Sequence, residues 1–267
     1  MHLLLAIILA CLLNSCDTVE MPSARNVSCL GHRGHVTEDN FENSLDAFLS
    51  AYNIGAQGTE LDVFHTKDGI PVVFHDSILR NLTTSKEGGF CPPDKSIGDF
   101  SLSQLHENCR LKNGDDIPLL EDVFILFAQT DFQIHIEFKG AASKKTVALL
   151  NKYYAGSYNK VRATFFYKDI GKSYRKTVAL LPAGMDVLVT HKNYISQMEA
   201  FFSGVDVEAI FNVDIKRLLF AGYKVGVYNV DTENNLTEMI KLGVHYITTN
   251  ELEKCLSIRN RVIENEK

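Results

Sequence analysis

Three short segments in the first third of the chain carry side chains that could act on a phosphate ester. They are Leu30–Gly34 (Leu-Gly-His-Arg-Gly), Thr59–Asp62 (Thr-Glu-Leu-Asp) and Phe74–Asp76 (Phe-His-Asp). Carboxylates at positions i and i+2 of a β-strand point to the same face, so Glu60 and Asp62 can bind one hard cation together. A cation, an arginine and two histidines form a set suited to cleaving a phosphate ester.

The spacing of apolar residues predicts the elements that would position these side chains. From residue 28 onward, short β-like runs alternate with amphipathic helical stretches. Strands are expected near Ser28–His32, Gly58–Phe64, Phe132–Phe138, Val161–Phe165, Met185–Val189, Val205–Val207, Tyr223–Tyr228 and His245–Thr248. Helices are expected near Ser44–Ile54, Leu119–Gln129, Lys144–Tyr154, Lys168–Leu180, Ile195–Phe202, Val213–Ala221 and Glu233–Leu242. This alternation predicts an α/β protein of the (β/α)8 TIM-barrel type. A doubly wound open sheet is the alternative, but no glycine-rich dinucleotide turn supports it.

The stretch Ile70–Leu120 interrupts this alternation between the second and third barrel strands. It starts with Ile70–Phe74, a predicted hairpin partner of the second strand, which follows the turn Lys67–Gly69. It then passes through Gly88–Asp94, in a loop too long to be a simple connection. We therefore expect a small loop-rich insertion that shapes the rim of a pocket.

The third strand is the best internal test of the barrel. Within Phe132–Lys139, one face carries only Phe and Ile, and the other carries Gln, His, Glu and Lys. In a barrel the apolar face would pack outward on the helices and the polar face would line the lumen. Glu137 and Lys139 would then lie at the C-terminal mouth, where barrel enzymes have their active sites.

Three carboxylates from two adjacent strands could form an oxygen-ligand site for one divalent cation. Glu60 and Asp62 come from the second strand and Glu137 from the third. Such ligands suit Ca²⁺ or Mg²⁺, and the choice between the two is open. No His or Cys spacing favours zinc.

The remaining charged residues of this mouth suit a phosphate and its proton transfers. Arg33 offers a planar fork for phosphate oxygens and Lys139 a point charge beside them. His32 and His75 can titrate near neutral pH, so one could take a proton from the nucleophile while the other gives one to the leaving alkoxide. Which histidine does which is left open by the sequence.

Composition limits the partners that the chain could bind. Its 267 residues are 45% apolar and 22% charged, as in an ordinary globular protein, and the length suits one barrel or two smaller domains. The net charge is −6 and no Lys/Arg run is present, which argues against a nucleic-acid partner.

Residues 1–16 are interpreted as a signal peptide of lipoprotein type. Leu3–Leu13 is too short to span a bilayer but suits a secretory signal, and Leu13–Cys16 resembles the lipobox in which Cys16 would be acylated. An ordinary signal peptide is the alternative, because Lys and Arg are missing before the apolar run and Asn14 is unusual in a lipobox. Residues 17–27 would be a tether and residues 28–267 the barrel domain. The protein is expected in the periplasm, anchored to the membrane only by this lipid, or else secreted.

Export would allow disulfides among the four cysteines that follow Cys16. Cys91 and Cys109 flank one loop-rich segment and are the favoured pair. Cys29 lies in an apolar strand and is interpreted as a buried small hydrophobic residue.

The order and spacing of several motifs resemble the glycerophosphodiester phosphodiesterase family. The resemblance covers residues 28–252 and is carried by Gly31–Gly34, Phe41–Ser44, Thr59–Val63, Thr66–Val73, His75–Asp76, Ile117–Glu121 and Ile136–Lys139. Phe41 stands where the family usually has proline. On the seventh strand the family often has Trp-Thr-Val-Asn, whereas this chain has Tyr228–Asp231 (Tyr-Asn-Val-Asp) and no Trp.

The resemblance implies hydrolysis of a small glycerophosphodiester to glycerol 3-phosphate and an alcohol. It implies His32 and His75 as the acid–base pair, with Arg33 and Lys139 as phosphate contacts. Glu60, Asp62 and Glu137 would be the metal ligands.

Three further residues are assigned weaker roles at the same mouth. Glu42 would hold Arg33 or a metal ligand. Asp76 would orient His75 or cap the next turn. Tyr228 would face the substrate or belong to the barrel core, so the accepted alcohol stays open.

Two other functions are weighed against this one. A phospholipase D-like or cyclising phosphodiesterase would act on intact lipids through an apolar mouth. A non-catalytic exported protein that binds phosphodiesters would be expected to lack one of the two histidines or three carboxylates, and all five are present.

Overall fold

The computed structural model describes residues 23–165, 172–190, 204–208 and 215–266. The predicted signal peptide, the first six tether residues and the predicted helix Ile195–Phe202 lie outside the described residues. The predicted helix Lys168–Leu180 is described only from residue 172 onward. Among the described residues, no helix is both long enough and apolar enough to span a membrane.

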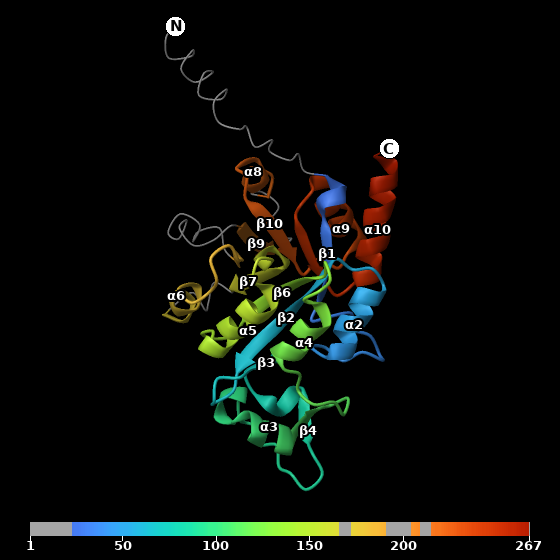
Figure 1. Ribbon diagram of the computed structural model, residues 1–267. Helices are drawn as coiled ribbons and strands as arrows, with labels where there is room; N and C mark the ends of the chain where they lie inside the picture. Colours follow the sequence, from blue (N-terminus) through green and yellow to red (C-terminus); the bar gives the residue numbers. More distant parts are fainter. Residues whose placement is uncertain (1–22, 166–171, 191–203, 209–214, 267) are drawn as a thin grey trace, which may run out of the picture.

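Eight parallel strands form a closed barrel, which confirms the predicted (β/α)8 fold (Figure 1). The strands are β1 (Ser28–His32), β2 (Gly58–His65), β6 (Gln133–Phe138), β7 (Val161–Phe165), β8 (Asp186–Val189), β9 (Gly204–Glu208), β10 (Lys224–Tyr228) and β11 (Tyr246–Thr249). They neighbour one another in that order, and pairing of His32 with Glu60 closes the ring between β1 and β2.

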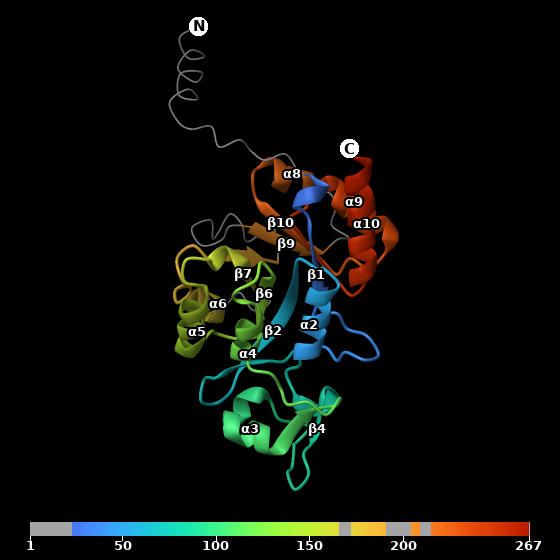
Figure 2. The same ribbon diagram turned by 45° about the vertical axis from the view of Figure 1, so that its right-hand side comes forward.

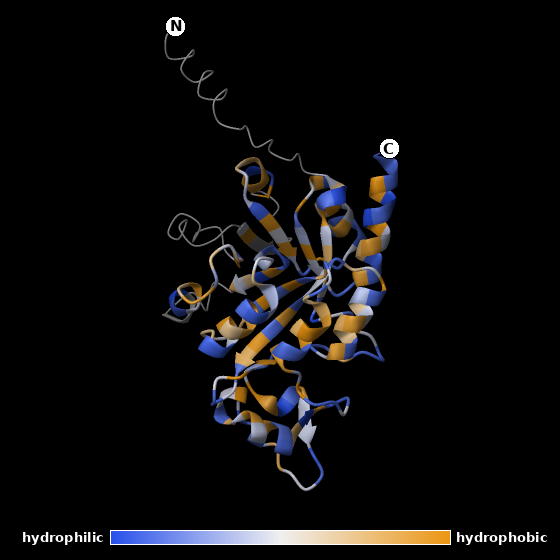
Figure 3. Cartoon of the chain, in the orientation of Figure 1, coloured by the Kyte–Doolittle hydropathy of each residue, from blue (hydrophilic) through white to orange (hydrophobic). Residues whose placement is uncertain are grey.

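Alternation of side chains along the strands explains which face lines the lumen. In β2, Leu61 and Val63 pack into the main hydrophobic core, whereas Glu60 and Asp62 lie on the opposite face. In β6, Ile134 and Ile136 belong to the same core, as the sequence predicts. Hydrophilic and hydrophobic residues accordingly alternate along β2 in Figure 3.

Helices cover the outside of the barrel and complete this core. They are α2 (Leu45–Asn53), α4 (Leu120–Phe127), α5 (Lys144–Tyr154), α6 (Lys172–Val178), α8 (Ile215–Phe220), α9 (Glu233–Leu242) and α10 (Leu252–Asn265), with short 3₁₀ turns η1 (Ala24–Asn26) and η4 (Tyr158–Lys160). Side-chain caps fix several N-termini: Ser44, Ser143 and Thr232 each accept a hydrogen bond from the backbone three residues on. Helix α10 has no counterpart in the predicted elements, although Leu252, Cys255 and Ile258 form its buried stripe.

The insertion between β2 and the next barrel strand forms a small unit at one end of the barrel (Figure 2). It contains β3 (Pro71–Val73), η2 (Leu79–Asn81), β4 (Thr83–Ser85), η3 (Ile97–Asp99), α3 (Leu102–Asn108) and β5 (Cys109–Leu111). Strand β3 pairs antiparallel with β2, and β4 pairs antiparallel with β5. A second hydrophobic cluster around Leu79, Ile97 and Leu105 packs inside it.

Two disulfides join the four described cysteines. Cys91 and Cys109 are bonded inside the insertion, as the sequence predicts. The interpretation of Cys29 as a free buried residue is wrong: it is buried, but it is bonded to Cys255 of α10, 226 residues away. Because α10 packs against β1, two cysteines from opposite ends of the chain become neighbours.

Candidate active site

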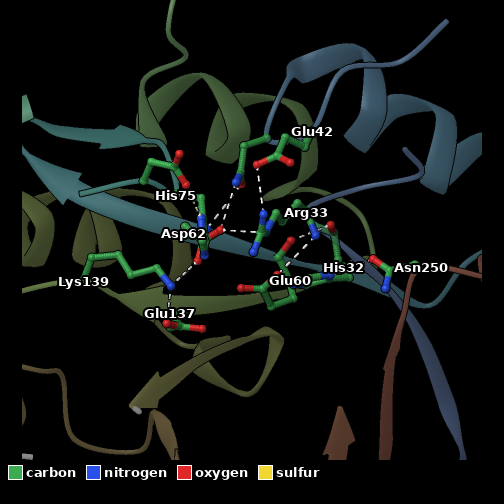
Figure 4. A network of polar contacts seen from close by, with 12 residues as sticks. His32, Arg33, Glu42, Glu60, Asp62, His75, Glu137, Lys139 and Asn250 are labelled. Atoms are coloured by element: carbon green, nitrogen blue, oxygen red, sulfur yellow. Dashed lines mark hydrogen bonds and ion pairs between the residues drawn. The ribbon is translucent and has the colours of Figure 1, made fainter. Parts of the chain in front are cut away.

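The polar side chains of the barrel mouth come together at the C-terminal ends of the strands (Figure 4). His32 ends β1, Glu60 and Asp62 come from β2, and Glu137 comes from β6. His75 follows β3, two residues after Val73 ends that strand. All members of the predicted acid–base pair and metal cluster therefore come from elements that meet at one end of the barrel.

Glu60, Asp62 and Glu137 form a compact carboxylate cluster. One oxygen of each lies within 4.8 Å of the corresponding oxygens of the other two. Glu60 Oε1 is buried and has no hydrogen-bond partner. Burial, followed by the nearby charges of Asp62 and Glu137, raises the pKa of Glu60 well above its ordinary value. Burial and the Asp62 charge likewise raise the pKa of Glu137. A divalent cation would give Glu60 Oε1 a partner and would neutralise the crowded negative charge of the three carboxylates. The three residues therefore fit a Ca²⁺ or Mg²⁺ site.

Lys139 partly neutralises this cluster. Its Nζ lies 2.8 Å from Asp62 Oδ1 and also contacts Glu137 Oε1. Burial lowers the pKa of Lys139, but the charges of the two carboxylates outweigh burial and raise it overall. The ammonium group of Lys139 is therefore charged throughout the physiological pH range.

Arg33 is held at the edge of the cluster by a strained turn. Its φ is 58°, and the amide of Gly34 donates to Gly31 O at 3.2 Å. The backbone amide of Arg33 donates to Glu60 Oε2 at 3.1 Å. Its guanidinium donates to Glu42 Oε1 at 3.0 Å and lies 3.4 Å from Asp62 Oδ2. The structure thus places Glu42 against Arg33.

Asn43 also contacts the cluster and was not among the residues selected from the sequence. Its Nδ2 donates to Asp62 Oδ2 at 2.9 Å, and the Asp62 amide donates back to Asn43 Oδ1 at 3.3 Å. Asn43 has a φ of 54°, a conformation that asparagine adopts more readily than most residues. The available signal was its place in the Phe41–Ser44 motif.

His32 is the first member of a three-residue chain of hydrogen bonds. Its Nδ1 lies 2.8 Å from Asn250 Oδ1, and Asn250 Nδ2 donates to Asp231 Oδ2 at 2.8 Å. Burial lowers the pKa of His32, and the hydrogen bond with Asn250 opposes this effect. Sequence reasoning missed Asn250 and Asp231, although Asn250 follows β11 directly and Asp231 lies three residues after β10.

His75 has a comparable chain on the insertion side of the mouth. Its Nδ1 lies 2.8 Å from Asp76 Oδ1, and Asn81 Nδ2 donates to Asp76 Oδ2 at 2.8 Å. Burial raises the pKa of Asp76, but the bonds from His75 and Asn81 lower it overall. Asn81 was also missed, because nothing in the sequence places η2 beside His75.

Tyr228 ends β10 at the same mouth and is half-buried. Its position in the fold is compatible with either of the two roles considered for it, contact with substrate or membership of the core.

Fold and site together define a (β/α)8 barrel with carboxylate, basic and histidine side chains gathered at its C-terminal mouth. A sequence model of the glycerophosphoryl diester phosphodiesterase family matches residues 32–254. The chain belongs to this family.

Individual relatives support the assignment along most of the chain. The glycerophosphodiester phosphodiesterase of Caldanaerobacter subterraneus subsp. tengcongensis is 28% identical over 244 residues, which cover 86% of this chain and 96% of the relative. The human lysophospholipase D GDPD1 is 29% identical over 181 residues, 66% of this chain and 55% of the relative. An Oleispira antarctica phosphodiesterase, solved with its product sn-glycerol-3-phosphate, has the same fold, with a TM-score of 0.69 and 19% identity over 87% of this chain and 96% of the other.

Proposed function

We propose that this enzyme hydrolyses glycerophosphodiesters to glycerol 3-phosphate and an alcohol, with one divalent cation and two histidines. The observation that carries the proposal is the carboxylate cluster of Glu60, Asp62 and Glu137 at the barrel mouth where His32 and His75 also lie. Family membership supports the substrate class.

Glu60, Asp62 and Glu137 would hold the cation, either Ca²⁺ or Mg²⁺. When bound, the cation would neutralise phosphate charge and polarise a P–O bond. Carboxylate oxygens alone suit both ions, and the support for a cation is the unpartnered Glu60 Oε1 within the crowded cluster.

Arg33 and Lys139 would bind the phosphate oxygens of the substrate. Glu42 holds the guanidinium of Arg33 from one side, so its remaining N–H groups have a fixed direction. Lys139 is held beside the cluster by Asp62 and Glu137. Tyr228, at the end of β10, would contact the alcohol part of the substrate.

His32 and His75 would carry out the two proton transfers. One imidazole removes the proton of the attacking hydroxyl, either water or a neighbouring hydroxyl of the substrate. The other protonates the oxygen that leaves phosphorus. Asp76 orients His75 through the 2.8 Å contact with its Nδ1.

A product assay on a panel of glycerophosphodiesters tests this function. His32→Ala and Glu60→Ala should each abolish release of glycerol 3-phosphate while the circular dichroism spectrum stays unchanged. EDTA should remove the activity and added Ca²⁺ or Mg²⁺ should restore it. Glu253→Ala, an exposed carboxylate of α10, is the matched control and should be fully active. Full activity of either site variant would disprove the assignment.

Action on lysophospholipids is a second candidate, which the human relative named lysophospholipase D favours. Phosphorus NMR with lysophosphatidylcholine and glycerophosphocholine as competing substrates separates the two. Preferential conversion of lysophosphatidylcholine to lysophosphatidate would favour the second candidate, and accumulation of a cyclic phosphate would indicate a cyclising reaction.

We also propose that the protein is exported and carries a lipid on Cys16. The two disulfides support an oxidising compartment, because such bonds are rare in reducing cytosol. Expression in a bacterium with radiolabelled palmitate tests the anchor. The wild-type protein should be labelled and sediment with membranes, and Cys16→Ser should be unlabelled. An unlabelled wild-type protein in the soluble periplasmic fraction would support an ordinary signal peptide instead.

A further inference from the structure

Most of the large hydrophobic side chains that stay exposed lie toward one end of the molecule. Among the described residues, four of these six side chains belong to the C-terminal parts of barrel helices: Tyr52 in α2, Ile125 in α4, Leu180 just after α6 and Phe220 at the end of α8. Because the helices of such a barrel run antiparallel to its strands, these parts lie toward the end opposite the mouth. Single exposed hydrophobic residues are common, but a group of them at one end indicates a contact surface.

Phe220 is the most exposed member of this group, with 93% of its surface open to solvent. Ile215, Leu218 and Leu219 form the buried face of α8, so the helical repeat turns Phe220 away from the barrel. Gly222 has a φ of 83° and turns the chain into β10 directly after this residue. The ring of Phe220 therefore adds nothing to the core, although the fold gives it a fixed direction.

The residues around Phe220 carry positive charge. Lys216 and Arg217 are both exposed, and none of residues 215–230 is acidic. The end of α10, at the same end of the barrel, carries the exposed Glu264 and Glu266 instead. The part that combines positive charge with exposed apolar surface is thus residues 216–223, which we call the α8 tip.

Helix α9 bounds the α8 tip and is mixed in charge. Lys216 and Lys241 border a groove together with Glu233 and Glu238. Glu233 is paired with Arg261 at 3.1 Å. The groove therefore has no net preference for anions, and the apolar, basic surface is confined to the α8 tip.

The proposed tether enters the barrel at the same end as the α8 tip. Strand β10 starts directly after the tip and runs parallel to β1, so both strands start at the end where η1 lies (Figures 1 and 2). Ser23, the first described residue, follows Cys16 by seven residues, which span at most about 25 Å. A lipid on Cys16 would therefore keep this end of the barrel close to the bilayer.

We propose that the α8 tip docks on the bilayer that holds the lipid of Cys16, with Phe220 among the headgroups, so that the barrel mouth opens away from this bilayer. The inference rests on the export and lipid anchor put forward under the proposed function. An aromatic ring flanked by lysine and arginine suits the boundary between anionic headgroups and acyl chains. A lipid chain and a basic surface together hold a protein on a membrane more firmly than either does alone.

The insertion at the other end is the rival contact, because its Phe90 is 69% exposed. Exposed acidic residues, Glu87 and Asp94, lie on both sides of Phe90 in the sequence, and the nearby Lys86 is paired with Asp116. The eight residues of β2 alone cover about 23 Å, and the insertion continues from the far end of that strand. Both charge and the reach of the tether therefore favour the α8 tip.

The orientation decides which substrates can reach the site. Small glycerophosphodiesters dissolved in water would enter a mouth that opens away from the bilayer. A lipid of that same bilayer would first have to withdraw its acyl chain into water, which the hydrophobic effect opposes. The docked enzyme should therefore hydrolyse glycerophosphocholine in solution and leave lysophosphatidylcholine of its own vesicle intact.

Tryptophan fluorescence can test the contact directly because the chain has no Trp. Phe220→Trp places a single fluorophore at the α8 tip, and Phe90→Trp is the matched control at the opposite end. The full chain is expressed in a bacterium, purified as the lipoprotein and reconstituted in phosphatidylcholine–phosphatidylglycerol vesicles, with and without brominated acyl chains. The emission of Phe220→Trp should shift to shorter wavelength on reconstitution and lose intensity in the brominated vesicles. The emission of Phe90→Trp should stay unchanged.

The two positive charges are tested in the Phe220→Trp protein. Lys216→Gln with Arg217→Gln should reduce the quenching by brominated lipid, because the attraction to phosphatidylglycerol is lost. Lys95→Gln with Lys112→Gln, two exposed lysines of the insertion, is the matched control and should leave the quenching as it was. Unchanged quenching in the first pair would overturn the role given to the charges.

Each result of the fluorescence experiment decides the inference. Quenching of Phe90→Trp would show that the mouth end contacts the bilayer, and quenching of neither Trp would show a barrel that hangs free on its tether. Both results overturn the inference, as does a purified wild-type protein that carries no lipid. Both Trp variants should release glycerol 3-phosphate at the wild-type rate, since neither position belongs to the site. A wild-type protein that is inactive on every glycerophosphodiester would disprove the proposed function and leave the fluorescence result standing.

Discussion

At the scale of single residues, Lys139 occupies the place of a counterion for the cluster. Its ammonium group lies between Asp62 and Glu137, two of the three proposed cation ligands. The side chain of Asp62 is only 1% exposed, so its charge cannot be compensated by water alone. A bound cation would therefore share these oxygens with Lys139 or displace it from them.

Replacing Lys139 with methionine should expose this competition. Without a divalent cation, Lys139→Met should lower the free energy of unfolding by about 3 kcal/mol, because two crowded carboxylates lose their partner. Saturating Ca²⁺ or Mg²⁺ should restore most of this loss, so the cation should raise the Tm of the variant more than that of the wild type. Denaturant unfolding with and without the cation measures both effects.

Lys152→Met is the matched control for this experiment. Lys152 also pairs with a glutamate, Glu121 at 2.8 Å, but it is 61% exposed. Its replacement should leave the unfolding curve and the cation response unchanged. Equal cation responses in all three proteins would show that Lys139 does not compete with the ion.

Protonation of Glu60 should couple cation binding to pH. Its pKa in the folded protein lies above its ordinary value of 4.5, so between these two values the folded state holds a proton that the unfolded state has lost. Without the cation, the free energy of unfolding should therefore fall as the pH rises through this window. Cation binding needs the ionised carboxylates and should release protons there. Calorimetry in buffers of different ionisation enthalpy measures the release, and buffer-independent heats would contradict the prediction.

Charged residues of the site could be selected from the sequence, whereas the amides that hold them could not. His32, Glu60 and Glu137 belong to strand ends with an unusual local concentration of charge. Asn81 and Asn250 carry no charge, and each acts only through a neighbour that the folded chain brings close. Their roles depend on tertiary contacts, such as the one between residues 32 and 250, which no local pattern contains.

At the scale of elements, the turn after β1 is fixed by close backbone contacts. A Cβ added to Gly31 would lie 2.4 Å from Gly34 O and 2.7 Å from Gly34 C. This turn carries His32 and Arg33. The backbone atoms of Gly34 occupy the space that a side chain at Gly31 would need.

Gly31→Ala should therefore damage the site through the turn. We expect a loss of about 3 kcal/mol in the free energy of unfolding, since backbone atoms must move, and a large loss of kcat. Gly98→Ala in η3 is the control, because a Cβ there meets only ordinary contacts at 3.7 Å and beyond. Denaturant unfolding and activity assays compare the two. A fully active, equally stable Gly31→Ala enzyme would contradict the assigned role of the turn.

Barrel strands were predicted to within one residue at each end because most of them are apolar, β-branched runs with a clear start and end. Even the short β9 (Gly204–Glu208) was found near its predicted place. Helix α10 was missed because charged residues interrupt its apolar pattern, in which only Leu252, Cys255 and Ile258 are buried. Helix α3 was missed because it lies within a segment interpreted as a loop-rich insertion.

At the scale of the whole molecule, the two disulfides stabilise different units. Cys29–Cys255 joins the first barrel strand to the last helix, and 226 residues separate its cysteines. Cys91–Cys109 closes a segment of 18 residues within the insertion, whose hydrophobic cluster is separate from the main core. Spacing along the sequence favoured the short pair and gave no sign of the long one, since only closure of the barrel brings Cys29 and Cys255 together.

Removing each pair should therefore have a different result. The loop-entropy relation gives about 5 kcal/mol for the Cys29–Cys255 bond and about 3 kcal/mol for Cys91–Cys109. The double variant Cys29→Ala with Cys255→Ala should unfold as a whole at lower denaturant. Cys91→Ala with Cys109→Ala should mainly increase hydrogen exchange within the insertion, between residues 79 and 111. Because Asn81 in this segment holds Asp76, and Asp76 holds His75, the second variant should also lose activity while the barrel amides stay protected. Exchange that rises equally in barrel and insertion would show that the two cores unfold as one unit.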